Sequence, residues 1–179
     1  QIMSTRTAIF KEMKDGIYQG VYVHTDGYIN YTGKLLNQYY KGNNKIDYII
    51  KQKYPIHSLG QSEKLINFNT QRTLAMERNV DGFMKYTTTC YDRPTIKHMY
   101  FKAESIEEIR NMQYLTYDEH DKLQGFMVED EFIPYRGSDN NGYLYLQDQS
   151  GLWYVSYMKN DKGDMSVFKP LNQVLKRLS

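Results

Sequence analysis

The segment from Tyr22 to Tyr28, which reads Tyr-Val-His-Thr-Asp-Gly-Tyr, holds the residues best suited to proton transfer. If the preceding strand continues through Asp26, then His24 and Asp26 point to the same face, because alternate residues of a strand do so. Histidine changes charge near neutral pH, and a neighbouring carboxylate can orient its ring. With Arg6, Lys11 or Lys34 to hold the phosphate, this pair would suffice for metal-free RNA cleavage in which the RNA's own 2′-hydroxyl is the nucleophile.

We therefore predict His24, Asp26 and Arg6 as catalytic residues. The alternative is a hydrogen-bonded turn in which His24 only packs beside Tyr22. Metal ligation is a third, less specific interpretation, because the histidines at 24, 57, 98 and 120 show no His-Glu-x-x-His spacing. Cys90 is the only cysteine, which excludes a multi-thiolate zinc site. We predict no metal site and no cofactor, and a buried structural role for Cys90.

A β-hairpin is expected to carry this segment. Residues 5–13 and 17–24 are rich in β-forming residues, and Asp15-Gly16 between them is the signal of a two-residue hairpin turn. Such a turn pairs Phe10 with Val21 and Ala8 with Val23 on a buried face. The opposite face would be open to solvent and would carry Thr7, Ile9, Lys11, Tyr18, Tyr22 and His24. A register shifted by one residue would exchange the two faces.

The remaining chain predicts helices and a second hairpin. Apolar residues at helical spacing favour helices over 32–40, 45–53 and 171–178, and a capping box of Ser105 and Glu108 predicts another over 105–112. A hairpin is indicated within 143–157, whereas residues 56–100 show little periodicity. The predicted fold class is α+β, with two hairpins in an antiparallel sheet covered by three or four helices. We expect one domain over 1–179, comprising the hairpin at 1–28 and an α+β body at 29–179.

Charge is unevenly distributed along the chain. The net charge is only +2, but residues 1–103 carry +7 and residues 104–131 carry −7. A basic first part attracts phosphate backbones or acidic partners, although an ordinary solvated surface also fits. The acidic stretch is either an exposed helix and loop or a contact for a basic protein groove. No apolar run is long enough for a membrane span, so we expect a cytoplasmic protein.

Tyrosine is the most unusual part of the composition. The chain has 18 tyrosines against 7 phenylalanines and 1 tryptophan. A phenol ring offers a stacking face and a polar tip, which suits RNA bases, although codon bias is the simpler explanation. The aromatic and basic residues of the outer hairpin face and of the motif are predicted to bind RNA: Lys11, Lys14, Tyr18, Tyr22, Tyr28 and Lys34.

The same residues carry a resemblance. Ser-Thr-Arg-Thr-Ala-Ile at 4–9, the Asp-Gly turn, Tyr-x-His-x-Asp-Gly-Tyr at 22–28 and the leucines after Gly33 resemble a family of small phage and prophage proteins. The tail, with Trp153-Tyr154-Val155 and Phe168-Lys169-Pro170-Leu171, is similar as well. Many members have tryptophan where this chain has Thr25. The resemblance covers the first third of the chain well, the tail in part and the middle hardly at all.

Within this family, the chain is similar to type II-A anti-CRISPR proteins that disable an RNA-guided nuclease by truncating its guide RNA. The resemblance implies a type II CRISPR effector nuclease and its guide RNA as partners, in the cytoplasm of a bacterial host. It implies a partner-dependent, ribonuclease-like activity. The alternative is a stoichiometric inhibitor that blocks guide loading or target DNA binding without cleaving RNA. The resemblance also implies that the acidic stretch over 104–131 contacts the basic RNA channel of the nuclease.

Overall fold

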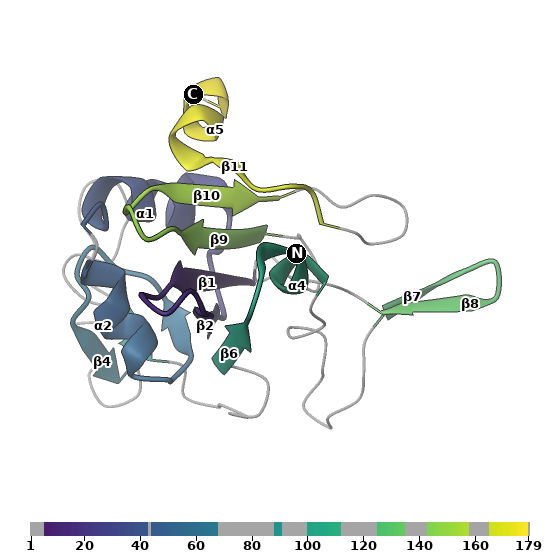
Figure 1. Ribbon diagram of the computed structural model, residues 1–179, viewed down its shortest axis with the longest axis horizontal. Helices are drawn as coiled ribbons and strands as arrows, with labels where there is room; N and C mark the ends of the chain where they lie inside the picture. Colours follow the sequence, from purple (N-terminus) through teal and green to yellow (C-terminus); the bar gives the residue numbers. More distant parts are fainter. Residues whose placement is uncertain are drawn as a thin grey trace.

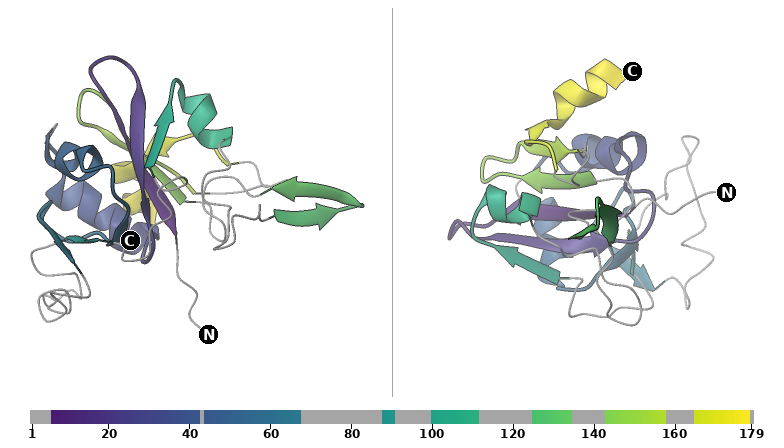
Figure 2. Two further views of the ribbon diagram at one scale, coloured as in Figure 1. Left: turned by 90° about the horizontal axis from the view of Figure 1, so that it is seen from below. Right: turned by 90° about the vertical axis from the view of Figure 1, so that its right-hand side faces the viewer.

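The computed structural model describes residues 6–42, 44–67, 88–90, 100–111, 125–134, 143–157 and 165–178. In these ranges the protein is α+β, with a mixed nine-stranded sheet, a separate two-stranded sheet, and helices on both faces of the main sheet (Figures 1 and 2). None of the described helices is long and apolar enough to cross a membrane.

Strands β1 (Thr7–Glu12) and β2 (Tyr18–Val23) lie at the centre of the main sheet and pair antiparallel. On its other edge β1 pairs in parallel with β9 (Tyr143–Gln147), which is followed by β10 (Trp153–Ser156) and β11 (Lys169–Pro170). The prediction of an antiparallel sheet is therefore wrong. The sequence indicates the two local hairpins, but β1 joins them through a parallel pair that no local pattern encodes.

The second edge of β2 is shared by two strands. β3 (Ile56–Ser58) pairs in parallel at Val23, and β6 (Tyr100–Ala103) pairs antiparallel with the other end of β2. β5 (Thr88–Cys90) and β4 (Leu65–Asn67) extend the sheet beyond β3. The C-terminal end of β2 is thus flanked by β1 on one side and by β3 on the other.

Three residues, and not two, form the turn between β1 and β2. The N–H of Met13 donates to the carbonyl of Ile17 and the N–H of Gly16 to that of Met13, both at 2.9 Å, and Gly16 has φ of 84°. This is the three-residue hairpin loop in which a left-handed glycine ends the turn. Ile9 consequently lies opposite Val21, and the predicted pairings are wrong by one residue.

One face of the β1–β2 pair forms the larger core with the helices. Ile9, Val21 and Val23 pack there against apolar side chains of four helical segments. These are η1 (a π-helix, Ile29–Gly33), α1 (Lys34–Tyr39), α2 (Lys45–Lys51) and α5 (Leu171–Leu178).

The opposite face is buried as well. Ala8, Phe10 and Tyr22 pack there against β6, β9 and Ile109 of α4 (Ile106–Asn111), and Figure 2 shows α4 across the sheet from α1 and α2. The prediction that one hairpin face is open to solvent is therefore wrong. Thr7 and Ile9 are fully buried, and Tyr22 is 5% exposed. The β1–β2 pair is the middle of the protein and does not project from it.

The helices agree with the sequence pattern. Predicted helices over 32–40, 45–53, 105–112 and 171–178 correspond to α1, α2, α4 and α5. The predicted cap of α4 also forms: the N–H of Glu108 donates to Oγ of Ser105 at 3.1 Å. The carboxylate of Glu108 accepts from the N–H of Glu104 at 2.9 Å, one residue before the position expected for a capping box.

Strands β7 (Gly125–Val128) and β8 (Glu131–Pro134) form the separate antiparallel sheet, here called the arm, which projects from the main sheet at the right of Figure 1. Met127 lies opposite Phe132, and these side chains are 61% and 46% exposed. The turn residues Glu129 and Asp130 both have positive φ, 48° and 69°. The arm therefore presents an apolar cross-strand pair behind an acidic tip.

Candidate active site

His24 and His57 meet at the C-terminal end of β2. β2 and β3 are parallel, with Val23 opposite Ile56, so the following residue of each strand lies beside the other on the same face. The two imidazole ring centroids are 5.7 Å apart, and the ring planes are inclined by 47°. Both side chains are half-buried. We call these two residues the histidine pair.

Tyr22 orients the first ring of this pair. It stands two positions before His24 on the same face, and its hydroxyl forms a 2.8 Å hydrogen bond with Nδ1 of His24. Tyr22 is itself held in the core against β6 and β9, so the phenol is a rigid partner. Because Tyr22 engages Nδ1, proton exchange with a substrate falls to Nε2 of His24.

The residues after His24 fasten the motif to β3. The N–H of His24 donates to the carbonyl of Ile56 at 3.0 Å, and both the N–H and Oγ1 of Thr25 donate to the carbonyl of His57 at 2.9 Å. Thr25, which stands where the resembling family often has tryptophan, thus ties the two histidine-bearing segments together.

Asp26 belongs to the turn and not to the strand. β2 ends at Val23, and Asp26 has a left-handed φ of 59°. Its carbonyl accepts from Oγ1 of Thr32 at 2.6 Å, and the next carbonyl, of Gly27, accepts from the hydroxyl of Tyr145 at 2.7 Å. The condition under which Asp26 would share a strand face with His24 is not met. His57, from a neighbouring strand, occupies the place beside the imidazole.

Arg6 precedes β1 directly. The β1–β2 register pairs Thr7 with Val23, so its continuation by one residue places Arg6 opposite His24 and on the same face. Arg6 is half-buried. Arg6, directly before β1, and His24, directly after β2, therefore lie in one row with His57 of β3 at one end of the sheet, with Tyr22 behind them. The row contains a guanidinium, two imidazoles and a phenol, which can provide a positive charge, a general acid and a general base.

Two of the predicted RNA-binding residues lie in the interior. Lys11 is 4% exposed, and its ammonium donates to Oε1 of Gln147 at 3.0 Å and to the carbonyl of Asp148 at 3.2 Å. Burial lowers the pKa of Lys11, an effect that the nearby carboxylates of Asp47 and Asp148 oppose. Tyr22 is buried as well, and its hydroxyl is hydrogen-bonded to Nδ1 of His24. Neither side chain can contact an RNA strand from these positions.

The other four predicted RNA-binding residues lie in two separate places. Lys14 and Tyr18 are at the turn end of the β1–β2 pair, and six residues of strand, about 20 Å, separate Tyr18 from His24. Tyr28, the last residue of the motif, is 39% exposed, and Lys34 is exposed at the start of α1. The structure therefore does not gather the six residues into one surface.

The described residues contain no group of three or more metal-ligating side chains.

Cys90 is half-buried in β5, and burial raises the pKa of its thiol, which disfavours the nucleophilic thiolate. Glu77, Arg78 and Arg93, which the sequence leaves without an assignment, lie outside the described residues.

The chain matches no family profile, no curated protein and no solved structure. The candidate site therefore depends on its geometry alone. Its main addition to the sequence-based prediction is His57. The sequence around His57 has no feature of a catalytic motif, because its proximity to His24 arises from a parallel pairing between distant segments.

Proposed function

We propose that this protein cleaves RNA by transesterification at the histidine pair. The observation that carries the proposal is the separation of 5.7 Å between the ring centroids of His24 and His57, which puts two groups able to exchange protons within reach of one phosphodiester. Both residues are only partly buried, so a substrate can reach them from the solvent.

The reaction needs one neutral and one protonated imidazole. The neutral ring takes the proton of a ribose 2′-hydroxyl, whose oxygen attacks the adjacent phosphorus. The bond from phosphorus to the 5′-oxygen breaks, and the protonated ring gives its proton to that oxygen. The products are a 2′,3′-cyclic phosphate and a 5′-hydroxyl, and each histidine ends in the protonation state in which the other began.

Two further residues support this step. Arg6, across the strand pair from His24, would stabilise the negative charge that grows on the phosphoryl oxygens. Tyr22 acts as a positioning residue, because its hydrogen bond to Nδ1 fixes the orientation of the His24 ring. These roles replace the predicted pairing of His24 with Asp26.

The proposed substrate is the guide RNA of a type II CRISPR effector nuclease, and the biological outcome is inactivation of that nuclease. The resemblance of the Tyr-x-His-x-Asp-Gly-Tyr segment and of the tail to phage anti-CRISPR proteins supports this substrate. The histidine pair supports the chemistry.

The test is a denaturing gel of guide RNA incubated with the nuclease and this protein, followed by analysis of the new RNA ends. The expected result is a shortened guide with a 2′,3′-cyclic phosphate and a 5′-hydroxyl, and an intact guide with His24→Gln or His57→Gln. Thermal melting of each variant serves as the control for folding. An intact guide under inhibitory conditions, or a 3′-hydroxyl with a 5′-phosphate, would refute the proposal.

A second candidate function is stoichiometric inhibition of the nuclease without RNA cleavage. The arm favours it, because Met127 and Phe132 are exposed side by side and three consecutive carboxylates follow at its tip, Glu129, Asp130 and Glu131. A two-stranded sheet is marginally stable in water unless it packs against something. The arm therefore suits contact with a protein surface that is basic and has an apolar pocket.

The two functions respond differently to the same pair of variants. Under the second function, Met127→Ser with Phe132→Ser abolishes nuclease inhibition, while His24→Gln retains it and the guide stays at full length. Under the first, His24→Gln abolishes inhibition. Measuring guide length and target DNA cleavage in parallel reactions separates them.

A further inference from the structure

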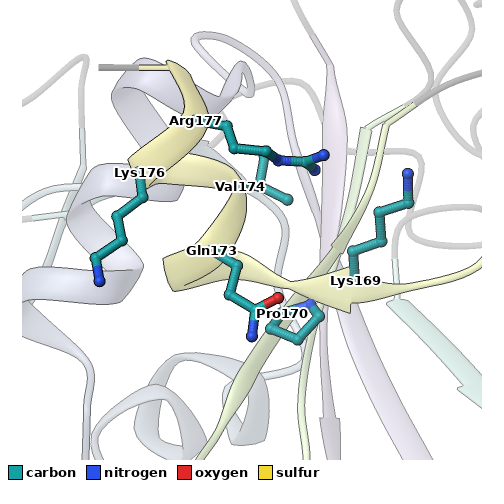
Figure 3. Close-up of a pocket in the computed structure, with 6 residues that line it drawn as sticks. All are labelled: Lys169, Pro170, Gln173, Val174, Lys176 and Arg177. Atoms are coloured by element: carbon teal, nitrogen blue, oxygen red, sulfur yellow. The ribbon is translucent and has the colours of Figure 1, made fainter.

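Two adjoining depressions flank the start of α5. The first has a volume of about 420 Å³ and is lined by Lys169, Pro170, Gln173, Val174, Lys176 and Arg177 (Figure 3). The second has a volume of about 560 Å³, and Pro170 and Gln173 line it too. Both volumes lie within the range of small-ligand sites. We call the two depressions together the α5 groove.

The first depression is strongly basic. Residues 165–178 include three cations and no acidic residue, and all three cations line it. In Figure 3, Lys169 and Arg177 extend on one side of α5 while Lys176 leaves the helix on the other. Cations that spread in this way do not converge on one small anion. They suit a chain of negative charges that crosses the helix.

The second depression offers polar and ring contacts. Amide side chains of Asn37, Asn172 and Gln173 line it together with Tyr154 and with Leu152, which is 59% exposed. The hydroxyl of Tyr154 lies 3.1 Å from Oδ2 of Asp148. Lys41 also lines this depression, but the carboxylate of Asp148 disfavours a phosphate beside Tyr154, so a neutral ring belongs there and the phosphates belong on the α5 side.

We propose that the α5 groove binds a single-stranded nucleic acid. Its phosphates lie against Lys169, Lys176 and Arg177, and an unpaired base enters the second depression, where amides read its edge and Tyr154 and Leu152 contact its face. This inference rests on the proposed function, since it takes the same substrate class, but it concerns a surface built from the tail and not from the histidine pair.

The experiment uses a fluorescent single-stranded 2′-deoxyoligonucleotide, which lacks the 2′-hydroxyl and so binds without being cleaved. Anisotropy titrations of the full chain over a range of salt concentrations should give a slope of log affinity against log salt of about −2 for three phosphate contacts. Lys176→Gln with Arg177→Gln should weaken binding about tenfold or more and make the slope shallower, at about −0.7 for the one remaining contact. Glutamine preserves the helix, since it is a good helix former.

The matched control is Lys51→Gln with Lys102→Gln, which removes the same charge from exposed residues outside the groove and should leave both slope and affinity unchanged. Equal losses in the two double variants, or no binding at all, would overturn the inference. Displacement of the strand by polyglutamate as effectively as by unlabelled strand would assign the groove to an acidic protein instead. An abasic strand that binds as tightly as the normal one would refute the base pocket.

The experiments distinguish a failure of the proposed RNA cleavage from a failure of the proposed nucleic-acid binding in the α5 groove. Groove-dependent binding of the deoxy strand without guide truncation would refute cleavage and keep the groove. Guide truncation that is unaffected by Lys176→Gln with Arg177→Gln, together with no deoxy-strand binding, would keep cleavage and refute the groove.

Discussion

His24, directly after β2, and His57, in the parallel neighbour β3, have their ring centroids 5.7 Å apart, and the hydroxyl of Tyr22 is hydrogen-bonded to Nδ1 of His24 at 2.8 Å. Backbone and side-chain hydrogen bonds from Thr25 to the carbonyl of His57 fix this relationship from the other side. The histidine pair is therefore positioned by the main sheet and not by a mobile loop, which is what acid–base catalysis requires of its groups.

The histidine pair predicts a bell-shaped dependence of guide truncation on pH, because one imidazole must be neutral and the other protonated. His24→Gln and His57→Gln should each lower the rate of guide truncation by about 10²–10⁴-fold.

Tyr22→Phe keeps the buried ring but removes the hydroxyl that is hydrogen-bonded to His24, so it should change the pH optimum of guide truncation more than it changes the stability of the fold. Single-turnover rates between about pH 5 and pH 9 provide the measurement. A rate that rises steadily with pH would contradict paired histidines.

Gln147 is predicted to be one of the most sensitive positions in the core. It is fully buried, accepts from the ammonium of Lys11 at 3.0 Å, and donates to the carbonyls of Tyr40, Gly42 and Gly151 at 3.0–3.3 Å. Gln147→Leu leaves a buried cation and three carbonyls without these partners, so it should lower the free energy of unfolding by about 3–5 kcal/mol. Urea denaturation gives the value.

A double-mutant cycle provides the control for Gln147. Lys11→Met in the Gln147→Leu background removes the stranded charge and should restore part of the lost stability, so the two substitutions together should cost less than their sum. Strict additivity would show that the two side chains are not coupled.

Gly20 is predicted to tolerate no side chain. A β-carbon at this position would come within 2.6–2.8 Å of the ring of Phe10, its partner across the β1–β2 pair. Phe10 is fully buried and stacks on Phe101, so it cannot easily move away. Gly20→Ala should therefore destabilise the protein by about 1–3 kcal/mol. Gly42→Ala is the matched control, since nothing lies within 4 Å of its β-carbon, and should be neutral within about 1 kcal/mol.

Alkaline pH is predicted to destabilise the protein through buried phenols. Burial raises the pKa of Tyr40 and of Tyr145 above the ordinary value. In the unfolded chain these groups lose their protons near pH 10, whereas in the folded chain they keep them. Their contribution to the free energy of unfolding is therefore complete below about pH 10. Above that pH it falls by about 1.4 kcal/mol per pH unit for each phenol. Burial also lowers the pKa of Lys11. This shift makes the stability of the fold rise with pH, but only below pH 10.5, the ordinary pKa of lysine.

Unfolding midpoints in urea from about pH 9 to pH 12 measure this loss, and Tyr145→Phe should remove one phenol's share of the slope. A stability that does not change over this range would show that both phenols ionise without unfolding.

Local patterns predicted local structure well. The helices α1, α2, α4 and α5 follow from apolar spacing and, for α4, from the Ser105 cap. Both hairpin turns coincide with Asp and Gly signals, and both are three-residue loops closed by a left-handed glycine, Gly16 in one and Gly151 in the other. Distinguishing a three-residue from a two-residue loop requires knowing which pair of residues closes it, and the sequence near Asp15 is compatible with either.

The long-range features were beyond such patterns. The parallel pair β2–β3 joins distant segments and explains why His57 lies beside His24. The parallel pair β1–β9, together with β6 and α4, explains why both faces of the hairpin are covered. One signal of double burial was present: residues 7–10 and 21–23 run without alternating polar residues, as is typical of a strand covered on both faces.

The parallel pair between β1 and β9 also constrains how the protein can be made. During synthesis β1 soon finds one neighbour, in β2, but its other edge stays open until residues 143–147 have been synthesised. Closing so long a loop slows folding, and an open edge with apolar residues on both sides favours aggregation in the meantime. A premature stop anywhere before β9 should therefore yield an insoluble chain and not a working N-terminal fragment.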